Sequence, residues 1–341
     1  MDIKEMIFEL CRVCGVSGSE EPALVLAKKL LEPFAKVTTD SNGNLYAELG
    51  NHSAEKTILL DAHIDRIGFI VTDINSGGFV KVDKCGGIDV RVLQDARLTT
   101  ADGRAEGTVC CLPPHLSNGS EDKAEPVSKL WVDFGMTADE VKQYIKPGDV
   151  LSFVSKPRML LGSRMTSPSL DNRCSVAALI KTAELLKDKN VGYKVVILLS
   201  SQEETFGSGA VTGAYKVNAD EAIAVDVSFA SQPDVTGQYS GIEVDGGPMI
   251  GISPVLNKKM TDKLISICDS DGRKYQLEPL SGRTGTNADH IAVSRGGVKT
   301  ALVSIPQRYM HTAVEVISLD DVEATAALLA DYIIRGGAFN D

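Results

Sequence analysis

TILLDAHID, residues 57–65, is the stretch that decides the fold, because it predicts a buried β-strand that ends in chemically active side chains. A short apolar run of this kind is typical of a strand covered on both faces, as in a parallel sheet. His63 and Asp65 follow directly on the run. Such groups are expensive to bury unless they are paired or bind a metal ion, so their position draws attention to this strand end.

Four further segments place a carboxylate or an imidazole at or near the end of a buried run. These side chains are Asp171 in SPSLDNR, Glu203 and Glu204 after VVILLSSQ, Asp226 in AIAVDV, and His311 in RYMHT. Functional groups on helix-covered sheets gather in the loops past the strand ends. We therefore expect the five segments to form one polar site, built from side chains of the types that bind zinc or cobalt.

The order of the predicted elements indicates an α/β fold. From about residue 165 onward, helical and strand patterns alternate, which implies a largely parallel central sheet with helices on both faces. Residues 1–66 supply helices, a hairpin and a strand to the same sheet. We expect helices at 2–12, 20–34, 172–188, 207–215, 257–270 and 319–335, strands at 57–65, 193–200, 221–227 and 298–305, and a hairpin at 36–50.

The pattern changes between about residues 67 and 160, where short strands alternate with Gly, Asp and Asn turns. The segment TADEVKQYI is the one helical pattern in this part. We therefore predict a discontinuous catalytic domain, residues 1–66 and 161–341, and an inserted small β-rich domain, residues 67–160. A long polar loop within the insert, residues 113–129, is a candidate for mobility or for contact with another subunit.

Composition and charge exclude several classes of function. The 341 residues have a net charge of −11 and no basic patch, so we expect no nucleic-acid binding. No apolar run reaches the ~18–20 residues that cross a bilayer, and the first residues lack the pattern of a signal peptide. We expect a cytoplasmic protein that does not bind membranes. Seven cysteines at irregular spacing then predict free thiols.

The polar residues match the needs of a hydrolytic site with two metal ions. Such a site uses a bridging carboxylate, further His or carboxylate ligands, and an unligated carboxylate that takes a proton from water. The sequence offers two imidazoles, two isolated aspartates and the adjacent pair Glu203 and Glu204, which could take different roles. If the strand continues, Asp65 lies on the same face as His63 and could bond the ring nitrogen that is not on a metal.

Each residue also has a plain structural interpretation. His63 alone could be a hydrogen-bonded core histidine, and His311 a surface one. Glu203 and Glu204 could occupy the first turn of a helix, where acidic side chains favour the positive end of the dipole. Asp171 could be a helix N-cap, and Asp226 could cap its strand end. The co-occurrence of all five segments favours the functional interpretation.

The order HID, SLDNR, QEE, AVDV, RYMH resembles the tetrahedral (TET) aminopeptidases, also called the glutamyl aminopeptidase-like family of dinuclear metallopeptidases. The resemblance spans nearly the whole chain and includes GVSGSEE, HIDRIGFIV, PPHL, PSLDNRCSVAALI and GTNADHIAVSRGGVKTALVSIPQRYMHT. Each motif alone is weak, but together, in this order and at comparable spacing, they are specific. The resemblance implies a zinc-exopeptidase fold and a PDZ-like insert that builds dimers and a hollow tetrahedral dodecamer.

Carried over position by position, the resemblance also implies the role of each site residue. Asp171 would bridge two divalent metal ions, with zinc as the first choice and cobalt or manganese as alternatives. Glu203 would be the general base, and Asp65 would orient His63. The remaining metal ligands would be His63 and Asp226 on one ion, and Glu204 and His311 on the other.

The chain departs from its relatives at three places. Many relatives carry an acid at the position of Arg66, a Thr-His pair at Ser228 and Phe229, and an aspartate at Asn287. None of these is an expected ligand, so the departures concern the substrate pocket and the surroundings of the metals. The implied function is release of N-terminal amino acids from peptides.

Three other functions compete with the aminopeptidase. A dinuclear deacylase of N-acyl amino acids would use similar ligands, but that class usually inserts an α/β dimerisation domain. Some relatives carry an endoglucanase label, and glycosidases also need two carboxylates, although they need neither two histidines nor a bridging aspartate. A non-catalytic scaffold would have lost ligands or the base, and none is missing here.

Overall fold

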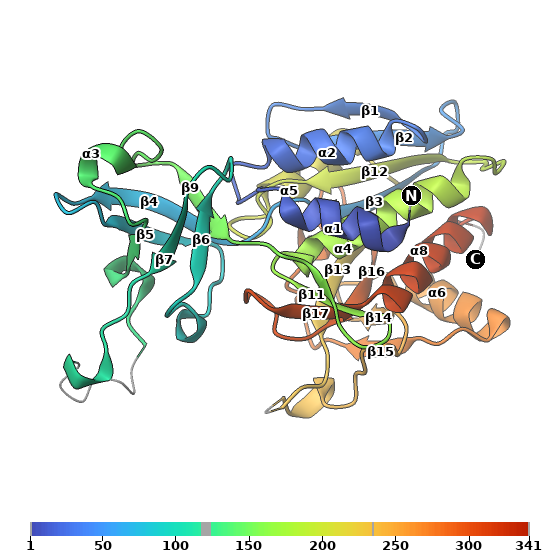
Figure 1. Cartoon of the computed structure of the whole chain (residues 1–341). Helices are drawn as coiled ribbons and strands as arrows, with labels where there is room; N and C mark the ends of the chain where they lie inside the picture. Colours follow the sequence, from blue (N-terminus) through green and yellow to red (C-terminus); the bar gives the residue numbers. More distant parts are fainter. Residues whose placement is uncertain (1, 117–123, 234, 340–341) are drawn as a thin grey trace.

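The computed structural model describes residues 2–116, 124–233 and 235–339 and shows two lobes, a helix-covered sheet and a smaller β-barrel (Figure 1). The sheet has the strand order β1-β2-β12-β3-β13-β16-β14-β15. Its strands are β1 (Lys36–Thr39), β2 (Leu45–Gly50), β3 (Thr57–His63), β12 (Lys194–Ser200), β13 (Glu221–Phe229), β14 (Met249–Ile252), β15 (Gln276–Pro279) and β16 (Lys299–Gln307).

The centre of the sheet is parallel and its flanks are mixed. Strands β12, β3, β13 and β16 run parallel to one another. The pairs β1–β2, β2–β12 and β14–β16 are antiparallel, whereas the edge pair β14–β15 is parallel again, so the expected parallel pairing predominates within a mixed sheet. The first of these pairs is the predicted hairpin, which turns at Asn42 and at Gly43, whose φ is +80°. A two-strand hairpin must be antiparallel, and this fixes that edge of the sheet.

Helices cover both faces of the sheet. One face packs against α1 (Ile3–Arg12), α2 (Glu21–Leu31), α4 (Leu170–Leu186), α6 (Lys258–Asp271) and α8 (Leu319–Ile334). The other packs against α5 (Ser208–Val217) and α7 (Ala288–Ala292). Neighbouring strand residues alternate between the faces, so Leu60 lies in the first core and Leu59 in the second. This double burial explains the continuous apolar runs in the inner strands.

The smaller lobe is a closed barrel with the strand order β4-β5-β8-β7-β6-β9. Its own hydrophobic core includes Phe69 and Phe153, whose rings meet edge to face at 5.5 Å. The strands are β4 (Gly68–Ile74), β5 (Val80–Cys85), β6 (Arg97–Thr100), β7 (Glu106–Val109), β8 (Trp131–Asp133) and β9 (Val150–Phe153). Closure of the barrel removes exposed strand edges from this small lobe.

Short elements complete the structure. Helix α3 (Ala138–Val141) starts with a capping box and is shorter than the sequence pattern predicts. Part of the loop 113–129 lies outside the described residues, while η2 (Pro114–Leu116) and η3 (Val127–Lys129) occupy its ends. The other short helices are η1 (Val90–Val92) and η4 (Gly237–Tyr239). Within the described ranges, none of the helices has the length and apolarity that a bilayer crossing requires.

A small antiparallel sheet beside α4, α8 and β16 was not predicted. It consists of β10 (Arg158–Met159), β11 (Arg164–Ser167) and β17 (Glu315–Ser318). Strand β11 leads from the barrel into the turn before α4, and β17 follows the loop that carries His311. The sheet therefore holds two of the predicted site segments next to each other.

Candidate metal centre

The structure brings all seven predicted site residues together at one end of the central sheet. His63 is the last residue of β3, and Asp226 lies near the end of the neighbouring strand β13. Glu203 and Glu204 lie in the turn between β12 and α5, not in the first turn of a helix. Asp65 follows β3, Asp171 lies at the start of α4 with non-helical backbone angles, and His311 lies in the loop between β16 and β17.

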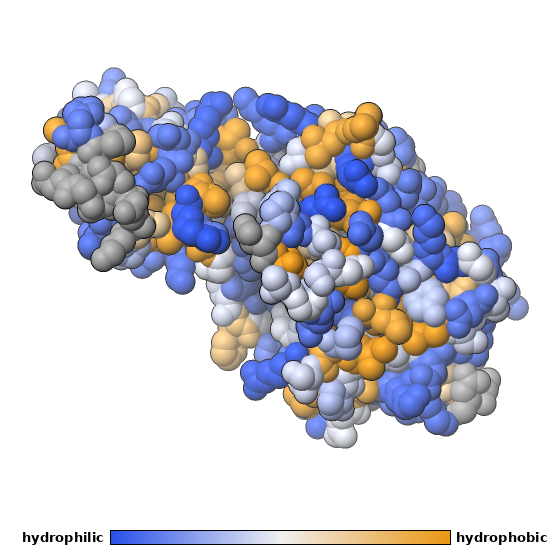
Figure 2. Space-filling view, turned by 90° about the horizontal axis from the view of Figure 1, so that it is seen from below, coloured by the Kyte–Doolittle hydropathy of each residue, from blue (hydrophilic) through white to orange (hydrophobic). Residues whose placement is uncertain are grey.

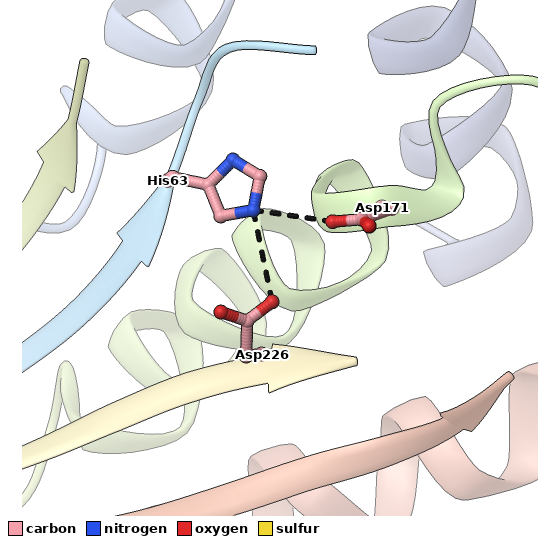
Figure 3. Close-up of side chains that lie close together, drawn as sticks. All are labelled: His63, Asp171 and Asp226. Carbon is pink, nitrogen blue, oxygen red and sulfur yellow. Dashed lines mark hydrogen bonds and ion pairs between the residues drawn. The ribbon is translucent and has the colours of Figure 1, made fainter. Parts of the chain in front are cut away.

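His63, Asp171 and Asp226 form one group of possible metal ligands (Figure 3). The Nε2 atom of His63 lies 3.1 Å from Oδ1 of Asp171 and 3.6 Å from Oδ1 of Asp226. All three side chains are buried. Figure 3 shows the two carboxylates converging on the same ring nitrogen from α4 and β13.

Asp171, Glu204 and His311 form a second group. The Nε2 atom of His311 lies 3.3 Å from Oδ2 of Asp171 and 3.3 Å from Oε2 of Glu204. Asp171 thus presents one oxygen to each group. This group is more open than the first, because about a third of the His311 side chain is exposed.

The electrostatics of the site leave an excess of negative charge. The seven residues comprise five carboxylates and two imidazoles. Burial raises the pKa of Glu203 to about 8 and that of Glu204 well above its usual range. Burial alone would lower the pKa of both histidines. The neighbouring carboxylates outweigh this effect, so the pKa of His63 is well above its usual value and that of His311 is about 10. Oε1 of Glu204 is buried without a hydrogen-bond partner among the described residues.

These observations fit divalent cations. Imidazole nitrogens and carboxylate oxygens are ligands of zinc, cobalt and manganese, and each group here converges within 4.8 Å. A buried oxygen without a donor, in a cluster where acids outnumber bases, lacks a positive partner. Cations at the two groups would supply it.

Asp65 fixes the turn that carries the two glutamates. It is fully buried and accepts hydrogen bonds from the backbone N–H groups of Glu203 and Glu204, at 3.0 and 3.1 Å. Its Oδ1 atom lies 3.4 Å from Nδ1 of His63, and its Oδ2 atom accepts the hydroxyl of Ser17. The ring of His63 therefore points Nδ1 at Asp65 and Nε2 at the ligand group.

Sequence reasoning missed two features of the site. Glu315 is buried and accepts the backbone N–H groups of His311 and Asp171, which ties both loops to β17. Its position four residues after His311 is the only signal in the sequence. The second feature is the barrel loop at Gly86 and Gly87: a Cβ on Gly87 would lie 2.9 Å from Nδ1 of His311. The barrel thus touches the second ligand group.

Comparison with known proteins places the chain among peptidases. The model of the family described as M42 glutamyl aminopeptidase matches residues 43–328. A lysyl aminopeptidase of Pyrococcus furiosus is 32% identical over 336 residues, which are 95% of this chain and 94% of that protein.

Solved structures show the same fold. The aminopeptidase APDkam598 of the archaeon Desulfurococcus kamchatkensis has a TM-score of 0.91 and 31% identity, over 98% of this chain and 95% of that chain. The TET1 peptidase of Pyrococcus horikoshii, which can assemble into a tetrahedron or a large octahedral shell, has a TM-score of 0.87 and 29% identity. That match covers 97% of this chain and 99% of the other.

Proposed function

Because the chain belongs to the M42 glutamyl aminopeptidase family, we propose that it releases N-terminal amino acids from peptides with two divalent metal ions and Glu203 as the general base. The observation that carries the proposal is the position of Asp171, whose Oδ1 faces His63 and whose Oδ2 faces His311. One carboxylate shared by two ligand groups is the arrangement of hydrolytic sites that hold a pair of metal ions.

The residues divide into two ligand sets. His63 and Asp226 would hold one ion and Glu204 and His311 the other, with Asp171 as the shared ligand. Zinc, cobalt or manganese bound there would polarise the scissile carbonyl and lower the pKa of a water molecule. Zinc is the first choice because His and carboxylate ligands suit it, although the same set accepts the other two metals.

The position and surroundings of Glu203 support its proposed role as the general base. Its side chain is mostly buried, belongs to neither ligand group, and brings Oε2 to 3.9 Å from Nε2 of His63. Burial raises its pKa to about 8, which brings proton uptake into the neutral range. A general base is most effective when its pKa lies near the working pH. We infer that Glu203 takes the proton of the attacking water and passes it to the nitrogen of the leaving peptide.

Two further carboxylates position this machinery. Asp65 holds the backbone at Glu203 and faces Nδ1 of His63, which leaves Nε2 free to act as a ligand. Glu315 holds the backbone at Asp171 and at His311. Neither side chain belongs to a ligand group, so we assign both to orientation.

We also infer a zinc-exopeptidase catalytic domain of residues 1–66 and 161–341, with residues 67–160 as a PDZ-like oligomerisation domain. The separate hydrophobic core of the barrel supports this division. The tetrahedral assembly of the Pyrococcus horikoshii peptidase supports a homo-oligomer, from a dimer up to a dodecamer. A strand-rich insert also disfavours the deacylase alternative.

The test is removal and return of metal. Dialysis against a chelator should abolish hydrolysis of a panel of aminoacyl-p-nitroanilides, and two equivalents of zinc, cobalt or manganese per chain should restore it. Metal content is measured by mass spectrometry on the same samples. A cellulose derivative and N-acetyl amino acids serve as controls and should not be cleaved. Full activity in metal-free protein, or cleavage of a control substrate alone, would refute the proposal.

A further inference from the structure

Two arginine side chains are buried close to each other beside the candidate metal centre. Arg66 follows Asp65 and is 1% exposed, while Arg173 lies two residues after Asp171 and is not exposed at all. Burial is the main cause that lowers the pKa of Arg173 to about 10, and the charge of Arg66 is the next. A buried charge is costly unless it is paired, and a like charge beside it adds to the cost.

Among the residues that the structure describes, most nitrogens of the two guanidinium groups have no acceptor. The Nε and Nη2 atoms of both Arg66 and Arg173 are buried and find no hydrogen-bond partner among the described residues. Nη1 of Arg173 donates to the carbonyl oxygen of Leu10 at 2.9 Å. Buried charged donors are nearly always satisfied in native proteins, so four unsatisfied nitrogens point to an acceptor that the described residues do not supply.

The acidic groups close to the arginines already accept hydrogen bonds from other parts of the chain. Glu315 directs its two oxygens at the backbone N–H groups of Asp171 and His311. Asp65 accepts three hydrogen bonds from other groups. The thiol of Cys11 is no counter-charge, because burial raises its pKa to about 11. In the part of the chain that the structure describes, no carboxylate oxygen lies within 4 Å of either guanidinium group, which is the ion-pair distance.

A pocket that opens to the surface reaches Arg66, the outer member of the pair. It has a volume of about 260 Å³ and lies between the N-terminal segment, Arg66 and the barrel strands β6 and β9. Its one acidic lining residue, Asp102, is paired with Arg104 and also accepts the hydroxyl of Thr100. Arg12 and Arg66 therefore give the lining a net positive charge. The other polar lining residues are Thr99, Ser152 and Ser155.

We propose that this pocket binds one small monovalent anion of the halide type, which accepts hydrogen bonds from Arg66 and compensates the charge of Arg173. The anion would lie at the inner end of the pocket, between the catalytic lobe and the barrel. Its negative charge would offset the positive charge of the two arginines next to Asp65, the residue that holds the turn of Glu203 and Glu204.

The chemistry of the pocket favours an anion with a single negative charge. Transfer of an ion from water into a poorly polar site costs more as its charge grows. Val13 and Phe153 contribute apolar surface to the lining, and Phe153 is 1% exposed. Sulfate and phosphate would bring a second negative charge into the pocket, whereas a halide carries one charge and has no fixed hydrogen-bond geometry.

Bromide is the direct probe. Crystals of the full chain grown in sodium bromide should give an anomalous peak at the bromine edge in this pocket, within hydrogen-bond distance of the Arg66 guanidinium. The same pocket in crystals grown without halide should hold weaker density or water. Water at the guanidinium in bromide-grown crystals, with no anomalous peak, would overturn the proposal.

A thermal measurement tests the same site in solution and does not depend on peptidase activity. At equal ionic strength, replacing gluconate by chloride at about 100 times its dissociation constant should raise Tm by about 3–5 °C. Arg66→Glu places a carboxylate beside Arg173 and should abolish this chloride effect. Arg158→Glu changes the net charge equally on exposed β10 and should retain it. An equal chloride effect in the wild type and Arg66→Glu would refute the site.

Discussion

The two lobes differ in what they bury. Within the described residues, the barrel between 68 and 153 buries no charged side chain, and its buried polar residues are Thr100 and Ser152. The lobe of the central sheet, called the catalytic lobe after its proposed role, buries many charged groups, namely Glu20, Asp61, Asp65, Arg66, Asp171, Arg173, Glu221, Asp226, Glu278, Glu315 and Asp321, in addition to His63. Buried apolar surface alone can hold a domain together, as the barrel illustrates.

This contrast in buried charge locates the chemistry in the lobe of the central sheet. Burying charged groups costs free energy, and a domain can fold without them. A dense cluster of buried carboxylates therefore indicates a functional site. The barrel should therefore respond to mutation mainly through stability, and the centre of the catalytic lobe mainly through metal binding and catalysis.

The largest effect is expected from Glu203→Gln. The amide keeps the size of the side chain but cannot accept a proton from water, so kcat should fall about 10²–10⁴-fold. Metal content should stay unchanged, because Glu203 belongs to neither ligand group. The measurement is steady-state kinetics on an aminoacyl-p-nitroanilide, together with metal analysis. Glu204→Gln is the matched comparison and should lose metal; normal turnover in Glu203→Gln would remove its role as base.

Phe69→Ala tests the opposite side of the contrast. Phe69 is fully buried in the barrel and packs against Phe153, so its truncation should lower the free energy of unfolding by about 3–5 kcal/mol. Ile70→Ala, at the next position on β4 and 36% exposed, is the control and should cost about 1 kcal/mol or less. Urea unfolding of both variants gives the comparison. Equal losses would mean that the barrel core does not carry its stability.

The sequence predicted the elements whose signals are local. Continuous apolar runs marked β3, β12, β13 and β16, and the helices around them begin and end within a few residues of their expected positions. The seven site residues could be singled out because each follows such a run or lies in a recognisable motif. Parallel strands bring their carboxyl ends together, so one site could be expected from five distant segments.

Features that depend on long-range packing could not be predicted. Strands β10, β11 and β17 have few residues, and the pairing of β11 with β17 joins segments that lie far apart in the sequence. Glu315 lies within such a strand, and its role depends on two loops that it contacts through backbone N–H groups. The contact of Gly87 with His311 joins residues 224 positions apart (311 − 87) and leaves no periodic signal.

Gly87→Ala tests the place where the lobes meet. The added methyl group would lie 2.9 Å from Nδ1 of His311, closer than ordinary contact, so His311 must shift. We expect about tenfold weaker binding of one of the two metal ions, similar to the loss of a ligand-orienting partner, with the other unchanged. Calorimetric titration of metal into metal-free protein measures this. Gly77→Ala, in an exposed turn of the same barrel, should bind both ions normally.

Asp321 provides the smallest effect and shows whether buried charge costs stability away from the metal centre. Burial raises its pKa to about 6, although it accepts the backbone N–H groups of Asp245 and Gly247 at 2.8 Å. The folded state then binds the proton more tightly than the unfolded chain. This contribution is therefore present at low pH and is lost as pH rises through about 6.

Between pH 5 and pH 7 the wild type should lose about 1 kcal/mol more unfolding free energy than Asp321→Asn, measured by urea unfolding. The variant is expected to be less stable at both pH values, since its amide accepts less well, but to depend less on pH. Parallel pH profiles for the two proteins would show that the Asp321 carboxylate does not titrate between these values.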